Sequence, residues 1–335
     1  ILSRQGIAYP SLVAVRMTLA KENISFCYSI KSNAGFPMFK IREIQSFITY
    51  LDTFRKKSQR PYDLKQEVMA LFKQKNTWTN QIEVILESWC RINSDMEISI
   101  ARAKDFVLET FLEEKREHKT GNGVFMGTIH SVKGMEFSIV FILDGGWKHL
   151  DIEEERRLFY VGMTRTKERL FLCHIDNMSN PHIRSLKGNA FVFERATKPA
   201  RINDFSNDLT ISILGLADIY LSYPGLFQDG HKIHRYLAKL EAGAKVRLKE
   251  QKNQVYICND ANQIIASLSK NGSAQWRNQT RNILNARVLG IIRRHQQENE
   301  ETSYKKVQVE SWELPIVEIL HKKFKKGCIK PDGGR

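Results

Sequence analysis

Apolar strands alternating with an amphipathic helix between residues 124 and 174 restrict the folds open to this 335-residue chain more than any other feature. A strand begins at Val124, a second runs from Ser138 to Leu143, and a third from Arg169 to His174. A helix is predicted from Ile152 to Met163, between the last two strands. Strands that are apolar throughout are typical of parallel sheets covered on both faces. The sequence therefore predicts an α/β unit with buried strands.

Two strings within this stretch carry a family resemblance. The first, GTIHSVKGMEFSIVFIL, begins at Gly127, and the second, EEERRLFYVGMTR, ends at Arg165. They resemble the fifth and sixth motifs of superfamily 1 DNA helicases of the UvrD/Rep kind. The resemblance extends more weakly over about residues 1–176. It implies a second RecA-like lobe with a parallel sheet, which acts on DNA, chiefly single-stranded, and uses ATP and Mg²⁺ together with an upstream RecA-like lobe.

The resemblance implies a catalytic and nucleotide-binding role for Arg165, which ends the sixth-motif string. ATP hydrolysis places negative charge on the γ-phosphate oxygens, and an arginine from the facing lobe stabilises that charge. The competing interpretation is a surface ion pair with Glu154 or Glu168. Arg4 is the second candidate, because Ile1–Arg4 resembles the end of the fourth motif, whose arginine also reaches the γ-phosphate in this family.

The fifth-motif string supplies the remaining candidates of this lobe. The resemblance implies that Thr128, His130 and Lys133 face single-stranded DNA, and that Gly134 and Glu136 belong to the nucleotide site, with Glu136 at the ribose. A hydroxyl and an imidazole can donate to phosphate oxygens, and a glycine turn lets the backbone approach an anion closely. A structural histidine in the core or at a helix cap is the competing interpretation of His130.

The chain contains no Gly-Lys dipeptide and no Asp-Glu pair after an apolar strand, so neither a Walker A nor a Walker B motif is present. It also begins at Ile1 rather than at a methionine. We therefore expect it to be the C-terminal part of a longer DNA motor, with the Mg²⁺ ligands upstream and no ATP hydrolysis by the isolated chain. Its last part resembles the C-terminal region of large bacterial helicases that join a RecQ-type engine to UvrD-like segments.

Composition supports a polyanionic partner. The formal net charge is +15, and lysine and arginine release the counterions condensed on nucleic-acid phosphates. A soluble protein with surplus surface lysine is the competing interpretation. The five cysteines are scattered, without metal-ligand spacing, which favours a reducing cytoplasm and no metal site. No apolar run reaches the ~18–20 residues that cross a bilayer, so no membrane partner is expected.

Patterning along the chain divides it into several parts. Full-size helicases of this kind carry a large inserted domain before the fifth motif, and here the space allows only a few helices. We expect a RecA-like lobe at 1–178 with a helical insertion at about 52–120, a linker at 179–208, a β-rich, barrel-like accessory domain at 209–320 and a basic tail at 321–335.

The β-rich region carries basic residues interleaved with an aromatic one. Lys245 and Arg247 precede Tyr256 on predicted strands, a pattern suited to phosphates and stacked bases. Residues 240–248 and 264–269 resemble small DNA-end-binding barrels of the HIRAN type. An ordinary solvated strand face is the competing interpretation. For the whole chain, the alternative to a motor lobe is a non-catalytic DNA-binding or scaffold module with a degenerate helicase lobe. A Walker A motif upstream of Ile1 would favour the motor.

Overall fold

The computed structural model describes residues 1–4, 9–24, 26–28, 37–94, 96–116, 123–147, 151–174, 180–184, 186, 192, 194, 208–298 and 307–323. The chain divides into two units. The first, which we call the parallel-sheet unit, combines Ile1–Ile30 with Arg116–Thr210. The second, which we call the composite unit, combines Lys31–Lys115 with Ile211–Arg335. Each unit is therefore assembled from two segments that are separated in the sequence.

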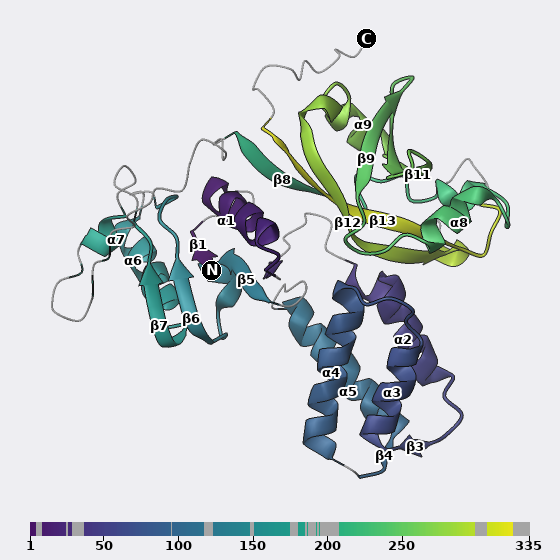
Figure 1. Cartoon of the computed structure of the whole chain (residues 1–335), viewed down its shortest axis with the longest axis horizontal. Coiled ribbons are helices and arrows are strands. Elements are labelled where there is room, and N and C mark those ends of the chain that lie inside the picture. The colour runs from purple at the N-terminus through teal and green to yellow at the C-terminus, as the bar shows by residue number, and fades with distance from the viewer. Residues whose placement is uncertain are drawn as a thin grey trace. The chain divides into compact units, whose positions relative to one another are not determined.

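The parallel-sheet unit is built on five strands in the order β2-β5-β1-β6-β7 (Figure 1). Its strand pairings are all parallel. Leu2, Met126 and Ile142 are each exposed by 1% or less, whereas Ile139 and Phe141 on β6 and Phe171 on β7 are 48%, 37% and 42% exposed. The strands are therefore buried on one face, and the other face of β6 and β7 is exposed. The structure thus confirms the α/β fold predicted here, with strands β1 (Leu2–Ser3), β2 (Phe26–Tyr28), β5 (Val124–Thr128), β6 (Phe137–Ile142) and β7 (Thr166–Leu172).

Helix α6 (Ile152–Met163) packs against β6 and β7 of this sheet. The carboxylate of Asp151 caps it by accepting a hydrogen bond from the Glu154 N–H at 3.0 Å. Glutamates at 153–155 occupy the first turn, where the helix dipole favours negative charge. Phe159 (3% exposed) carries the buried side of α6 into the core. The other helical segments of this unit are α1 (Pro10–Lys21), η2 (Ile129–Val132) and α7 (Pro181–Arg184).

The first segment of the composite unit is helical. Helix α4 begins with a capping box, in which the Asn76 side chain accepts from the N–H groups of Trp78 and Thr79. It packs against its neighbours α2 and α3. A short antiparallel pair, β3 (Ser58–Gln59) with β4 (Ile98–Ser99), ties the loops together. The helices are η1 (Met38–Lys40), α2 (Arg42–Asp52), α3 (Pro61–Ala70), α4 (Thr77–Asn93) and α5 (Ile100–Arg116).

The second segment of the composite unit is the predicted β-rich region, and the structure confirms it as two three-stranded sheets, β11-β10-β9 and β12-β13-β8. The long antiparallel pair of β12 and β13 dominates it (Figure 1). Its strands are β8 (Leu209–Leu214), β9 (Val246–Gln251), β10 (Gln254–Asn259), β11 (Ile264–Ser267), β12 (Ile283–His295) and β13 (Ser311–Lys322). Short helices η4 (Pro224–Leu226), α8 (Lys232–Ala238), α9 (Lys270–Trp276), η5 (Thr280–Asn282) and η6 (Gln296–Glu298) connect them.

Two predicted boundaries differ from what the structure shows. The helices expected as an insertion at about 52–120 already begin with α2, and they group with the β-rich region rather than with the parallel sheet. Strand β13 continues past the predicted start of the tail, and His321 within it is only 2% exposed. Most of the predicted linker at 179–208, and residues 324–335, lie outside the described residues.

The helices join the β-rich region at a bulge in β12. The register of β12 against β13 shifts immediately before Gly290, which leaves Leu289 without a partner residue on β13. The Leu289 carbonyl instead accepts a hydrogen bond from the indole Nε1 of Trp78 at 2.8 Å, and Trp78 is fully buried. Ile41 adds an isolated bridge to Ile292. The bulge therefore frees the Leu289 carbonyl, which a regular β12–β13 pairing would have used, to accept from Trp78.

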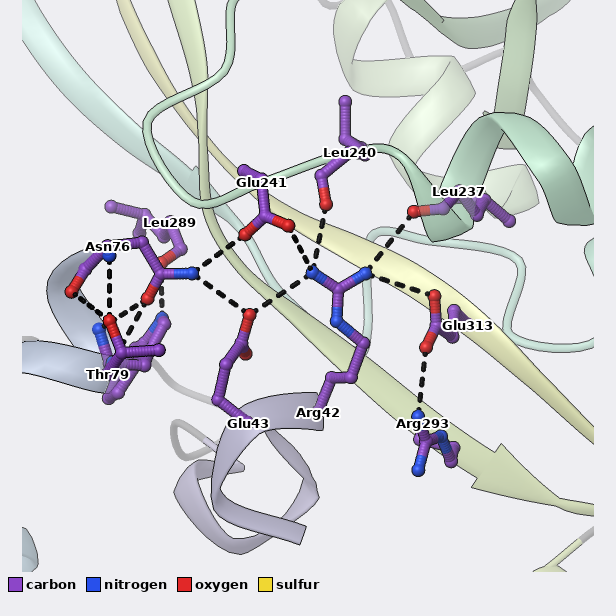
Figure 2. A network of polar contacts seen from close by, with 11 residues as sticks. Arg42, Glu43, Asn76, Thr79, Leu237, Leu240, Glu241, Leu289, Arg293 and Glu313 are labelled. Carbon is purple, nitrogen blue, oxygen red and sulfur yellow. Dashed lines mark hydrogen bonds and ion pairs between the residues drawn. The ribbon is translucent and has the colours of Figure 1, made fainter. Parts of the chain in front are cut away.

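Arg42 lies at the centre of a polar network at the same junction (Figure 2). Its side chain is only 13% exposed. Burial by itself lowers the pKa of the Arg42 guanidinium, but the surrounding carboxylates outweigh burial and raise the pKa above its ordinary value. Removing one partner of a buried ion pair typically costs about 3–5 kcal/mol. The guanidinium donates to the carboxylates of Glu43, Glu241 and Glu313 and to the carbonyls of Leu237 and Leu240.

Gly290→Ala tests the fit at this junction. A Cβ at Gly290 would lie 2.6 Å from Ile41 Cδ1 and 2.8 Å from Trp78 Nε1. We therefore expect overpacking to lower the free energy of unfolding by about 1–3 kcal/mol. Thermal unfolding followed by circular dichroism measures the change. Gly215→Ala is the control, because no atom lies within 4 Å of its Cβ position. Equal midpoints for the two variants would contradict the close fit.

Candidate functional site

The segment between β5 and β6 crosses the parallel sheet from one edge to the other. The two strands run in the same direction with β1 between them. The chain therefore leaves β5 after Thr128 at the carboxyl edge and enters β6 at Phe137 at the amino edge. We call residues 129–136 the crossing loop. Ile129 and Val132 in its η2 turn are fully buried, and η2 packs against α6.

The residues predicted to contact DNA lie at the start of this crossing. The Thr128 hydroxyl oxygen accepts a hydrogen bond from the Ser131 N–H at 3.2 Å, and the Ser131 hydroxyl donates to the Thr128 carbonyl at 2.7 Å. These bonds fix the first turn of η2. His130 and Lys133 are exposed. The turn thus carries a hydroxyl, an imidazole and an ammonium, all of which can donate to phosphate oxygens.

The residues predicted to contact the nucleotide lie at the end of the crossing loop. Gly134 has a φ of +88°, a conformation that glycine adopts without strain, and its Cβ position is open to 4 Å. The Glu136 carboxylate lies 3.1 Å from the Lys167 ammonium, and both side chains are more than half exposed. Such surface pairs are weak. Glu136 is therefore available to hydroxyl groups of a ligand.

Arg165 follows α6 and folds back over its last turn. Its Nε donates to the Val161 carbonyl at 3.0 Å, and one terminal nitrogen donates to the Thr164 hydroxyl at 3.1 Å. The other terminal nitrogen donates to the Met135 carbonyl at 3.3 Å. Met135 directly precedes Glu136, so these contacts hold the end of the sixth motif against the end of the fifth.

The surface ion pair considered for Arg165 is absent from the part of the chain that the structure describes. None of the carboxylates there, including those of Glu154 and Glu168, pairs with its guanidinium. A guanidinium has five N–H donors, and the three contacts above leave two for a further acceptor. Arg165 is thus positioned by backbone and hydroxyl oxygens and keeps its charge uncompensated.

Arg4 lies at the opposite edge of the sheet. It follows Ser3, which pairs with Thr128 across β1 and β5. Its Nε is 3.7 Å from a carboxylate oxygen of Glu155, in the first turn of α6. Arg165 comes after the last turn of the same helix, ten positions after Glu155, which corresponds to about 15 Å at the helical rise. The structure therefore does not bring together the two arginines that were predicted to share a γ-phosphate.

Lys245 and Arg247 belong to the composite unit, at the start of β9, and both are exposed. Arg247 lies 3.2 Å from Asp260, and the side chains are 66% and 70% exposed. Tyr256 in β10 pairs with Lys249 in β9, so an aromatic ring does adjoin the basic strand. These residues make up a second candidate surface, separate from the parallel-sheet unit.

Asp144, which is buried, and His174, which is exposed, form a polar pair at the carboxyl edge that the sequence patterns did not single out. Asp144 follows β6 and is 2% exposed. One carboxylate oxygen accepts from the Gly145 N–H at 2.7 Å, and the other lies 3.2 Å from His174 Nδ1. Burial, and then the Asp144 charge, raises the pKa values of the Tyr9 phenol and the Cys173 thiol. In the sequence, the position of Asp144 just after an apolar strand could have indicated a polar residue at the carboxyl edge of the sheet.

Residues 17–177 match the sequence profile of the UvrD-like helicase C-terminal domain. The match takes in β2, the helical segment, the crossing loop, α6 and β7. It excludes the β-rich part of the composite unit. None of the helices in the described ranges is long and apolar enough to cross a membrane.

Individual bacterial helicases are similar over the same part of the chain. DNA helicase II of Rickettsia typhi is 28% identical over 199 residues, which cover 52% of this chain and 30% of the relative. The ATP-dependent DNA helicase PcrA of Staphylococcus aureus is 28% identical over 203 residues, covering 51% of this chain and 27% of the relative. The chain thus spans less than a third of the length of these relatives.

Gly162→Ala tests whether α6 and the crossing loop are closely fitted. A Cβ at Gly162 would lie 2.9 Å from Ile129 Cδ1 and 3.1 Å from Ile142 Cδ1. We expect a loss of about 1–3 kcal/mol in the free energy of unfolding, because the methyl group overpacks this contact.

A second substitution provides the control for this fit. Ile129→Val removes the nearest clashing atom, and by itself such a change costs about 0.5–1.5 kcal/mol. If the clash is real, the double variant Gly162→Ala/Ile129→Val loses less stability than the two single variants together. Strictly additive losses, measured by thermal unfolding, would show that α6 and the loop do not touch at Gly162.

Proposed function

Residues 17–177 are a UvrD-like helicase C-terminal domain, and from this we propose that the chain supplies the second RecA-like lobe of an ATP-dependent DNA helicase. The proposal rests above all on Arg165. Its guanidinium is fixed against the Met135 carbonyl beside Glu136, carries no partner carboxylate within the described residues, and retains two N–H donors. An arginine held in this way suits charge that develops on a phosphate.

In the proposed mechanism the amino edge of the sheet faces the nucleotide. Glu136 accepts from the ribose hydroxyls, and the open backbone at Gly134 lets the nucleotide approach. Arg165 donates to the γ-phosphate and stabilises the charge of the transition state. ATP supplies the transferred phosphoryl group, and Mg²⁺ neutralises charge on the phosphates. The ligands of Mg²⁺ are expected in the upstream lobe of the same polypeptide.

The carboxyl edge is proposed to face single-stranded DNA. Thr128, His130 and Lys133 donate to phosphates, which position the strand without reading its sequence. The crossing loop connects this edge with the nucleotide edge and lies against α6, whose last residue, Met163, is followed two positions later by Arg165. A movement of Arg165 on ATP hydrolysis can therefore shift the DNA-contacting residues through α6 and the crossing loop. Lys245 and Arg247 add phosphate contacts from the composite unit.

Arg165→Ala in the polypeptide that joins this chain to its upstream lobe tests the nucleotide role. We expect steady-state ATP hydrolysis, with saturating single-stranded DNA, to fall by a factor of about 10³–10⁵, the usual contribution of an arginine finger. Arg4→Ala is the comparison, because Arg4 lies beside Thr128 at the other edge. A loss below about tenfold for Arg165→Ala, or a larger loss for Arg4→Ala, would reassign the γ-phosphate contact.

The chain without that lobe is expected to bind DNA but not to turn over ATP, because it has no phosphate-binding Gly-Lys motif. Malachite-green detection of phosphate release measures this directly. A DNA-stimulated turnover of about 1 s⁻¹ or more, within the usual range of enzymes, would contradict the proposal that ATP hydrolysis requires the upstream lobe. If neither the chain nor the joined polypeptide hydrolyses ATP, the alternative of a DNA-binding scaffold with a degenerate lobe is the better description.

A further inference from the structure

A cleft in the composite unit lies between two strands that are each at the edge of a sheet. β9 ends the order β11-β10-β9, and β12 begins the order β12-β13-β8. They meet at an isolated bridge between Lys245 and Arg287, and on their other sides β9 pairs with β10 and β12 with β13. The space between them has a volume of about 590 Å³, within the range of small-ligand pockets.

The two walls of the cleft differ in chemistry. The β9 wall is cationic, whereas the β12 wall is apolar with amide and hydroxyl groups at its rim. Leu284, on the β12 wall, is 52% exposed, so its apolar side chain is accessible to a ligand. The cleft is lined by Lys245, directly before β9, by Arg247 of β9 and its partner Asp260, by Ile283, Leu284 and Asn285 of β12, and by Thr280 of η5.

The cations of the β9 wall are available to a ligand. Lys245 has no ion pair within the described ranges, and the pair of Arg247 with Asp260 is solvent-exposed and therefore weak. Lys249 continues the row on the same face of the strand, because alternate residues of a strand point to one side at intervals of about 6.7 Å. An extended polyanion can follow such a row.

Backbone groups add to these contacts. Ile283, Asn285 and Ala286 of β12 pair with β13 on one side only, with Leu284 unpaired at a shift of register, and β9 pairs with β10 on one side only. Each strand thus has a row of N–H and C=O groups turned away from its sheet. Backbone N–H groups are regular donors to phosphate oxygens.

We propose that this cleft holds an unpaired segment of a single nucleic-acid strand. Its phosphates lie along Lys245, Arg247 and the strand edges, and a base lies against Ile283 and Leu284. The bases of a duplex are stacked and cannot reach this apolar wall, so the site selects single strands. The assignment deepens the proposed function, on which it rests, by adding a defined single-strand site outside the motor lobe.

Fluorescence anisotropy of the full 335-residue chain with a labelled oligomer of twenty deoxythymidines tests the cationic wall. Lys245→Gln/Arg247→Gln is expected to weaken binding at least tenfold. It should also reduce the log–log salt slope by about 1.4, since each phosphate contact contributes ~0.7. Lys232→Gln/Lys239→Gln is the matched control, because both lysines are exposed on or beside α8, outside the cleft, and the charge change is identical. Equal losses for the two pairs would overturn the proposal.

Leu284→Thr tests the apolar wall. It is expected to weaken binding several-fold without changing the salt slope, because it removes apolar contact but no charge. An oligomer that carries 5-bromodeoxyuridine should cross-link to residues 280–287 of the wild-type chain on irradiation. Circular dichroism establishes that each variant is folded. Cross-links confined to the parallel-sheet unit would overturn the proposal.

Competition experiments decide between occupants. The assignment would be overturned if a duplex of the same length displaced the labelled oligomer as effectively as an unlabelled single strand does. Equally effective displacement by polyglutamate of the same charge would also overturn it, and would indicate an acidic peptide that adds to the strand edges. Thr128→Ala/His130→Ala separates the two proposals. If Thr128→Ala/His130→Ala leaves the affinity unchanged and Lys245→Gln/Arg247→Gln lowers it, the proposed DNA contacts of the parallel-sheet unit are wrong and the cleft assignment holds. If only Thr128→Ala/His130→Ala lowers the affinity, the cleft assignment alone is wrong.

Discussion

The junction around Arg42 and Trp78 is the constraint on which the composite unit depends. Without the Arg42 guanidinium, Glu43 and Glu241 would keep, among the described residues, only hydrogen bonds from Asn76, and Glu313 would keep only its ion pair with Arg293. Without Trp78, the bulge carbonyl of Leu289 would lose its donor. Both contacts join helices from the first segment to strands of the second, although 271 positions separate Arg42 from Glu313 and 211 separate Trp78 from Leu289. The helices between β2 and β5 therefore serve as a support for the β-rich region.

Strand β12 links this junction to the proposed nucleic-acid site. Its bulge at Leu289 and Gly290 receives the helices, and its first residues form the apolar wall of the cleft. The same strand pairs with β13 along its length, with shifts of register at Leu284 and Leu289. A strand fixed at one end by buried contacts gives the cleft a rigid wall, and rigid elements hold a binding geometry more accurately than loops do.

In the parallel-sheet unit, topology separates the two sets of candidate residues. Because β5 and β6 are parallel and not adjacent, the fifth motif must cross the sheet, and its two ends reach opposite edges. Helix α6 packs against this crossing loop and runs across the sheet in the same direction, so Glu155 lies at the Arg4 edge and Arg165 at the Glu136 edge. Gly162 allows the helix to approach Ile129 closely. One helix and one loop thus connect the proposed nucleotide contacts with the proposed DNA contacts.

The sequence by itself determined the parallel α/β unit, the β-rich region and the local order of the candidate residues from Thr128 to Arg165, because apolar runs and short strings are encoded by neighbouring residues. Those residue roles stay predictions. Only the tertiary structure decided that the helices from α2 onward pack on the β-rich region, that Arg4 lies apart from Arg165, and that Asp144 meets His174. Each of these depends on contacts between distant residues or on which edge of a sheet a strand end reaches, and no local pattern specifies either.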